Sequence, residues 1–370
     1  MTNLGAIAQI VMKCNILNGH SKDIDKLSRT IHYGTSINCA ICSEERMRID
    51  IHAHVLPFDC FDAVDSAGRH FGPGKIEGVK GKKESSLAAT DTAQFWDLET
   101  RIKDMDATNV DLQAISVIPP AVTYELDAEG GAWYSRRLNE GIARMVKECP
   151  ERFVGIADVP LQNPAKAVAE LDRAVNRLGM RGVQILANIS GRDLDWPELM
   201  PFYKEVQALD VPVFIHPRPP ASNRMDKYHL NNLIGNPLDT TLAAAHLVFS
   251  GILDKFPGLK FCLAHAGGQV PYLRGRWEHG YNVRADAKAV IKEPPSKYLP
   301  LFYFDTITHS DPLLKYLIGS VGADKVMMGT DYPFDMADTE PVARMQRLTG
   351  ITQRDKQLVF GGNAARLLKL

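Results

Sequence analysis

The pattern that most constrains the fold is a regular alternation of short apolar β runs with longer amphipathic segments across residues 47–370. Eight strand-like runs can be recognised, each followed by helical sequence: Ile49–His54, Leu112–Ile118, Phe153–Ala157, Gly182–Leu186, Val213–His216, Lys260–Ala264, Leu301–Asp305 and Lys325–Gly329. The clearest amphipathic segments are Leu98–Thr108, Ala132–Glu148, Pro164–Leu178, Pro197–Leu209 and Asp239–Phe256. This alternation predicts an α/β fold, a (β/α)8 barrel of the TIM type, in which catalytic groups lie at the carboxyl ends of the strands.

Side chains that commonly bind metals stand at the ends of four of these runs. His52 and His54 lie two residues apart on the first run, so on a strand they point to the same face. His216 ends the fifth run, His265 follows the sixth and Asp331 follows the eighth. Because the carboxyl ends of all barrel strands meet at one mouth, these side chains are predicted to form a site for a divalent cation.

Such a site supports more than one reaction. A cation held by imidazole and carboxylate groups is a strong Lewis acid and lowers the pKa of a bound water to about 7. Histidines exchange protons near neutral pH, so His265 could relay a proton to or from a substrate. Attack of metal hydroxide on a carbonyl gives amide or lactone hydrolysis, attack on an activated alkene gives hydration, and proton transfer to the carbon bearing a carboxylate releases carbon dioxide. Asp305, which ends the seventh run, could support a metal ligand from behind.

A structural zinc site is the non-catalytic alternative. Structural sites usually have four closed ligands and favour cysteine, whereas this set contains histidine and aspartate near an open mouth. The residue types therefore favour an enzyme.

Composition limits the partners and the location. The 370 residues include 43 basic and 44 acidic side chains, which argues against nucleic acid or an anionic membrane as a partner. No apolar run approaches the ~20 residues that span a bilayer, and residues 5–12 lack the features of a secretory signal. The cysteines, among them Cys60, Cys149 and Cys262, do not resemble a disulfide scaffold, so we expect free thiols and a cytoplasmic protein.

Two regions stand apart from the barrel pattern. Residues 1–46 lack clear periodicity and are predicted to form an N-terminal extension of unknown role; within them, Cys39 and Cys42 have redox or zinc spacing but no second pair. Residues 55–96 are too long for a simple loop after the first strand and are predicted to be an insertion, or lid, over the barrel mouth. Four of its lysines could meet an anionic substrate: Lys75, Lys80, Lys82 and Lys83.

The motifs resemble those of the amidohydrolase superfamily, specifically its branch of metal-dependent decarboxylases. The resemblance runs from about Met47 to the C-terminus and rests on the segments Ile49–His54, Arg152–Gly155, Gly182–Ile185, Phe214–Pro217, Phe256–Lys260, Ala264–Gly268 and Gly329–Phe334. It implies the oxygen-independent decarboxylation of a small unsaturated or aromatic carboxylic acid.

The resemblance also implies a site with one divalent metal, Zn²⁺ in the first place and Mn²⁺ as the alternative, with water at its open position. The implied ligands are His52, His54, His216 and Asp331. His265 is implied as the acid/base residue, with Asp331 helping to orient the water. Arg276 falls where the family places an arginine that reaches the active site of the other subunit of a homodimer and binds a substrate carboxylate. Many hydrolases of the superfamily bridge two metals with a carboxylated lysine, but Gln184–Asn188 contains none.

The chain departs from one group of these decarboxylases at two substrate contacts. That group has an arginine shortly before the Trp-Asp pair that opens the first helix, and residues 85–96 contain none. A tryptophan in its loop after the fifth strand is replaced by His229. Phe334, three residues beyond Asp331, could pack against a planar substrate. We therefore predict substrate contacts from Arg276, His229 and Phe334, and a substrate that differs from that of the group.

Overall fold

The computed structural model describes residues 47–72, 93–219 and 222–370, which belong to one compact unit, Arg46–Leu370. Three sequence-based predictions fall outside the described residues: the extension 1–46 with Cys39 and Cys42, the middle of the insertion at 73–92, and the four lysines of that insertion. They stay predictions.

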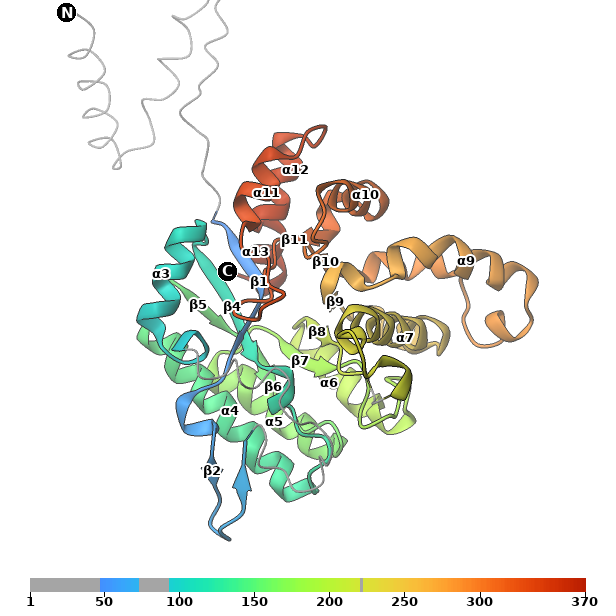
Figure 1. The fold of residues 1–370 in the computed structure, drawn as a ribbon. Helices are drawn as coiled ribbons and strands as arrows, with labels where there is room; N and C mark the ends of the chain where they lie inside the picture. Colours follow the sequence, from blue (N-terminus) through green and yellow to red (C-terminus); the bar gives the residue numbers. More distant parts are fainter. Residues whose placement is uncertain (1–46, 73–92, 220–221) are drawn as a thin grey trace, which may run out of the picture. The chain divides into compact units, whose positions relative to one another are not determined.

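The strands that form the barrel are parallel and follow one another in sequence order (Figure 1). Their bounds are β1 Ile49–Val55, β4 Leu112–Val117, β5 Phe153–Gly155, β6 Ala157–Asp158, β7 Val183–Leu186, β8 Val213–His216, β9 Phe261–Leu263, β10 Phe302–Asp305 and β11 Val326–Met327. Hydrogen bonds join them in the orders β1-β4-β5 and β6-β7-β8-β9-β10-β11.

Two junctions connect these sheets. β5 and β6 are halves of one run separated by Ile156, and this run pairs with β4 on one side and β7 on the other. At the other end, Ile51 N donates to Met328 O (2.9 Å) and His54 N to Tyr332 O (2.7 Å), which links β1 to the chain after β11. The eight strand positions thus follow the order of a (β/α)8 barrel, and the predicted fold class is confirmed.

Helices α3 to α10 lie between successive strands along the chain, and α11 to α13 follow the last strand (Figure 1). Their bounds are α3 Leu98–Thr108, α4 Ala128–Glu148, α5 Pro164–Leu178, α6 Met200–Leu209, α7 Asn236–Phe249, α8 Ile252–Lys255, α9 Val270–Val283, α10 Asp311–Val321, α11 Pro341–Arg347, α12 Gln353–Gln357 and α13 Asn363–Leu368. Asp97, Asn163 and Ser310 cap α3, α5 and α10 by accepting from main-chain N–H groups of the first turn. The segment predicted as one helix, Asp239–Phe256, is broken because Gly251 adopts φ 76°, a left-handed conformation.

The amino ends of the strands are closed by the C-terminal helix. Apolar side chains at the start of the strands form a buried cluster with α13: Ile49, Ile51, Leu112, Ala114, Val154, Ile156, Cys262, Met327, Ala364, Leu367 and Leu368. Because this end is filled with apolar groups, polar chemistry inside the barrel is confined to the carboxyl ends of the strands.

The described parts of the predicted insertion contain a 3-10 helix, Phe58–Cys60, and a short antiparallel hairpin of β2 (Ala63–Val64) and β3 (His70–Phe71). Leu56 N donates to Phe95 O (3.0 Å), so the two ends of the insertion meet beside β1. Its role as a lid stays a prediction. Over the described part of the chain, no helix combines the length and apolar character needed to cross a bilayer.

Asp158, at the end of β6, is a buried carboxyl group with a single hydroxyl donor. Its Oδ2 accepts from Ser135 Oγ (2.6 Å), and its Oδ1 has no hydrogen-bond partner among the described residues. Burial raises the pKa of Asp158 from 3.8 to about 7. The folded protein therefore retains this proton up to about pH 7, whereas the unfolded chain releases it near pH 4, so the free energy of unfolding should fall as the pH rises between these values.

We predict that Asp158→Asn makes the free energy of unfolding less dependent on pH in this window, because a carboxamide cannot ionise but still accepts from Ser135. Urea unfolding at about pH 5 and about pH 8 measures the effect. The exposed Asp335→Asn is the matched control and should keep the wild-type dependence. If the free energy of unfolding changes with pH by the same amount in Asp158→Asn and in wild type, the pH dependence belongs to another group.

Candidate metal centre

The five side chains predicted at the barrel mouth do converge. His52 and His54 lie on β1, His216 ends β8, and Asp331 follows β11. All four are buried, whereas the His265 side chain, which opens the turn after β9, is 16% exposed. The sequence prediction that these distant segments meet is therefore correct.

A bulge in β1 helps to aim the two neighbouring histidines. Asp50 pairs with Gln113 of β4 and Ala53 with Ile115, so two residues of β1 face one residue of β4. As a result Ile51 and His52, although consecutive, both line the barrel interior. The Nε2 atoms of His52 and His54 lie 3.0 Å apart.

The Asp331 carboxylate lies between the imidazoles. Its Oδ1 is 3.3 Å from His52 Nε2 and 3.1 Å from His54 Nε2, and its Oδ2 is 3.3 Å from His265 Nε2. The His216 ring centre lies 5.3 Å from that of His52 and 5.0 Å from that of His54. Its Nε2 is buried and has no hydrogen-bond partner among the described residues.

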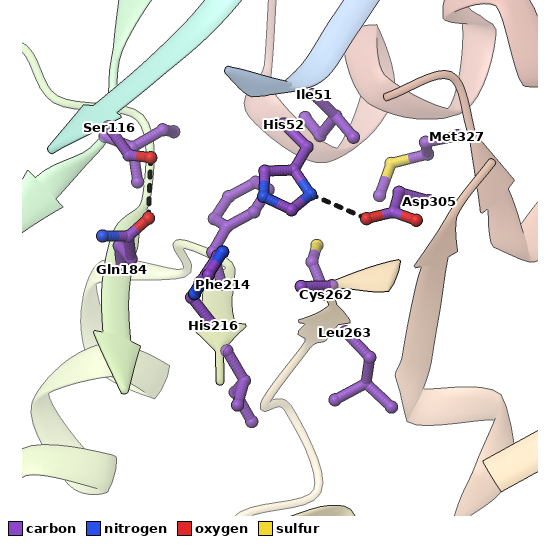
Figure 2. Close-up of a pocket in the computed structure, with 13 residues that line it drawn as sticks. Ile51, His52, Ser116, Gln184, Phe214, His216, Cys262, Leu263, Asp305 and Met327 are labelled. Carbon is purple, nitrogen blue, oxygen red and sulfur yellow. Dashed lines mark hydrogen bonds and ion pairs between the residues drawn. The ribbon is translucent and has the colours of Figure 1, made fainter. Parts of the chain in front are cut away.

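The other ring nitrogen of each buried histidine contacts an oxygen acceptor. His52 Nδ1 lies 2.8 Å from Asp305 Oδ2, a contact drawn in Figure 2. His54 Nδ1 lies 3.2 Å from Val117 O, and His216 Nδ1 lies 2.8 Å from Pro217 O. Acceptors at all three Nδ1 atoms place the proton of each neutral ring there, so the Nε2 lone pairs face the site.

This arrangement fits a metal cation. The Nε2 lone pairs of the three histidine rings in their neutral form and the Oδ1 atom of Asp331 face one another. No hydrogen-bond donor of a neutral group lies among these four atoms. Metal-binding imidazoles typically donate their other N–H to a carboxylate or a main-chain carbonyl, as His52, His54 and His216 do here. An imidazole and carboxylate set of this kind suits Zn²⁺ and other divalent transition metals.

The position of His265 allows two interpretations. The ligand atoms of His52, His216, His265 and Asp331 all lie within 4.8 Å of one another, so distance alone admits His265 as a ligand. However, His265 Nδ1 has no hydrogen-bond partner among the described residues, in contrast to the Nδ1 atoms of the other three histidines. His265 thus lacks, within the described part of the chain, the acceptor at Nδ1 that holds each of the other three rings, and this difference favours a role other than that of a ligand.

Charge is concentrated at this centre. Burial lowers the pKa of His52, but the carboxylates of Asp331, Asp305 and Asp50 outweigh it and raise that pKa to about 9. Without a cation this ring therefore favours a proton at the position that a metal would take. Burial and neighbouring imidazoles lower the pKa of His216 well below its usual value. Burial opposes ionisation of Asp331, yet the surrounding histidines hold its pKa well below the usual range. Asp331 is therefore an anion at neutral pH, ready to pair with a cation.

Asp305 supports the centre from behind, as its place at the end of β10 predicted. Besides its contact with His52, it accepts from the main-chain N–H groups of His265 (2.8 Å), Ala266 (2.7 Å) and Ile307 (3.0 Å). One carboxylate thus fixes both the His52 ring and the turn that carries His265.

Two cavities border the centre. The inner one, of about 20 Å³, lies within the barrel behind His52 and His216 and is large enough for one water molecule (Figure 2). The outer one, of about 500 Å³, opens beside His265 and Asp331 and is the candidate substrate cavity. Its polar lining also includes Asn236, Thr308 and His309. Sequence reasoning missed Asn236 and Thr308; the position of Thr308 just beyond β10 is the signal that could have indicated it.

The predicted substrate-binding residues differ in their placement. Phe334 lies at the centre, with its ring 5.3 Å from that of His54 and 5.6 Å from that of Phe95. His229 is exposed, and neither cavity is lined by it. Arg276 is exposed on α9 and does not line the outer cavity. The structure thus brings Phe334 to the site and leaves the roles of His229 and Arg276 as predictions.

Known proteins share both the sequence and the fold. The amidohydrolase family model matches residues 49–370. A 2-amino-3-carboxymuconate-6-semialdehyde decarboxylase of Dictyostelium discoideum is 33% identical over 334 residues, which cover 88% of this chain and 92% of the relative.

Solved structures agree. A 2,6-dihydroxybenzoate decarboxylase, complexed with 2,6-dihydroxybenzoate, has a TM-score of 0.75 at 27% identity over 88% of this chain and 100% of its own. A dihydroxybenzoic acid decarboxylase from Polaromonas sp., with bound manganese and 2-nitroresorcinol, has a TM-score of 0.74 at 28% identity over 88% and 97%. The chain therefore belongs to the amidohydrolase family, within its branch of metal-dependent decarboxylases.

Proposed function

We propose that this decarboxylase holds one divalent metal through His52, His54, His216 and Asp331, with His265 as the acid/base residue. One observation supports this assignment above the others. The Nε2 lone pairs of the three histidines and the Asp331 carboxylate oxygen face one another, and no hydrogen-bond donor of a neutral group lies among them. The manganese in the Polaromonas structure supports a divalent ion. Zn²⁺ is our first expectation because three imidazoles and a carboxylate suit it, and Mn²⁺ is the alternative.

A bound metal supplies Lewis-acid polarisation of a substrate oxygen. The chain's own residues direct the proton. His265, with its Nε2 3.3 Å from Asp331 Oδ2 and its ring at the wall of the cavity, donates a proton to the carbon that bears the carboxylate. The bond from this carbon to the carboxylate then breaks, its electron pair restores the conjugation, and carbon dioxide leaves. His265 regains its proton from solvent, so the net reaction replaces the carboxylate by hydrogen.

The substrate proposed is a small aromatic or unsaturated carboxylic acid. Phe334 offers an aromatic surface beside His54, which suits a planar ring or a conjugated chain. The relatives and solved structures described above are decarboxylases, so hydrolysis and hydration become the less favoured alternatives.

A second subunit would supply the positive charge that the outer cavity lacks. Among the described residues, no lysine or arginine lines the outer cavity, although the substrate is an anion. The cavity rim carries exposed apolar side chains, with Tyr272 80% and Leu313 57% exposed, as expected for a surface covered by a partner. We propose a homodimer in which Arg276 of one subunit binds the carboxylate in the other.

The proposed location is the cytoplasm. Cys60, Cys149 and Cys262 are free thiols, and burial raises the pKa of Cys60 to about 12, which keeps it unreactive. A reducing compartment is where such thiols persist.

We predict that the metal-loaded protein releases carbon dioxide from at least one member of a panel of hydroxybenzoates and muconate-type acids. Headspace or coupled detection of carbon dioxide measures this, and matched amides and lactones are run in parallel. Turnover of amides or lactones with none of the acids would replace decarboxylation by hydrolysis.

We predict that His265→Ala keeps the metal but loses activity by about 10²–10⁴-fold, because it removes the proton donor and no ligand. Elemental analysis and steady-state kinetics on the same sample measure both quantities. The matched variant His216→Ala should lose the metal as well. Loss of metal from His265→Ala would make His265 a ligand instead.

We predict that Arg276→Ala mainly raises KM, because it removes a carboxylate partner and leaves the metal centre intact. Mixing Arg276→Ala with Asp331→Ala subunits should partly restore activity, since each hybrid dimer would contain one complete site. Activity is measured against mixing ratio after subunit exchange. The absence of any restoration, with exchange confirmed, would exclude a shared site.

A further inference from the structure

Arg101 of α3 is a fully buried cation without an anionic contact among the described residues. The residue is 0% exposed, and its guanidinium donates to neutral oxygens: Nε to Gln113 Oε1 (2.8 Å), Nη1 to His54 O (2.9 Å) and Nη1 to Gln94 O (2.8 Å). Burial lowers the pKa of Arg101 to about 10, so the group remains charged at neutral pH. A buried charge of this kind is costly, which calls for a reason beyond filling space.

The contacts of Arg101 fall on two of the three chain segments that carry the proposed metal ligands, β1 and the segment around Asp331. One is the carbonyl of His54 itself, on β1. Another is the ring of Tyr332, which lies 4.7 Å from the guanidinium carbon and follows Asp331 in the chain. The Tyr332 hydroxyl also donates to Asp104 Oδ2 (2.7 Å), one turn further along α3. A single helix thus holds the main chain on either side of the centre.

An amide connects Arg101 to a second anchor between the same segments. Gln113 accepts from Arg101 and donates through Nε2 to Asp50 Oδ2 (3.0 Å). Asp50 Oδ1 accepts from the main-chain N–H groups of His52 (3.1 Å) and Thr330 (3.0 Å), and Oδ2 accepts from the Thr330 hydroxyl (2.6 Å). Thr330 directly precedes Asp331. The network therefore reaches the main chain of His52 and His54 and the residues on either side of Asp331, without contacting any of the facing ligand atoms.

We propose that Arg101 is a positioning residue that sets the spacing between the β1 histidines and Asp331, and thereby the affinity and geometry of the metal centre. This inference rests on the proposed metal site. Outer contacts that orient ligands typically change metal affinity by about 10- to 100-fold. Lysine cannot reproduce them, because it lacks the planar fork that reaches Gln113 and two carbonyls at once.

The test measures the metal itself. Zn²⁺ affinity is determined by competition with a chromophoric chelator, and the Co²⁺-substituted protein is recorded by visible absorption. We expect Arg101→Lys to bind Zn²⁺ about 10- to 100-fold more weakly and to change the Co²⁺ spectrum. Arg173→Lys is the matched control: its side chain is 15% exposed and pairs with Glu140 and Glu170 on α4 and α5. It should keep the wild-type affinity and spectrum.

A second pair of variants covers the case in which Arg101→Lys does not fold. Tyr332→Leu removes the ring under the guanidinium and should weaken Zn²⁺ binding, whereas Tyr332→Phe keeps the ring and should stay within about 3-fold of wild type. Wild-type affinity and spectrum in folded Arg101→Lys, or in Tyr332→Leu, would overturn the positioning role. Failure of the wild-type protein itself to bind Zn²⁺, Mn²⁺ or Co²⁺ would instead overturn the proposed metal site.

Discussion

The hydrogen bonds between β1 and the chain after β11 are the constraint on which the centre depends. Ile51 N to Met328 O and His54 N to Tyr332 O join segments separated by about three quarters of the chain. They place His52 and His54 against Asp331 at distances of 3.3 and 3.1 Å. Bringing mutually repelling lone pairs together costs free energy, so a rigid frame must hold them. Parallel ladders supply that frame because each strand is fixed on both sides.

Asp331 connects binding and chemistry because its two oxygens face different groups. Oδ1 faces His52 and His54, and Oδ2 faces His265. A cation at the imidazole side would share this carboxylate with His265, the proposed acid/base residue. One side chain would then contact both the proposed metal and the proposed proton donor.

The sequence was sufficient for the fold class and for the five residues at the mouth, because period-2 runs and their ends follow directly from side-chain types. Residue types alone left ligand and acid/base roles open, and the family resemblance supplied the assignment. The structure adds which oxygen meets each Nδ1, such as Val117 O for His54, which no sequence pattern indicates. The burial of Arg101 could not be predicted from the sequence either. An arginine in a helical segment is expected to lie on the surface, and only its packing against Tyr332 shows that it does not. The break at Gly251 needed backbone geometry that an apolar pattern conceals.

Specificity must reside outside the metal centre, because the centre can polarise any suitably placed oxygen. The outer cavity is lined by neutral polar groups, His265, His309 and Asp331, together with an apolar rim. An anionic substrate bound by this lining alone would lose the water molecules that hydrate its charge. Its contacts with the lining would be too weak to compensate for that loss. Its charge has to be met by the metal or by a cation from outside this lining. Binding of the carboxylate by a cation from outside this lining would favour decarboxylation. A carboxylate held away from the metal would leave the metal free to polarise the oxygen that activates the ring.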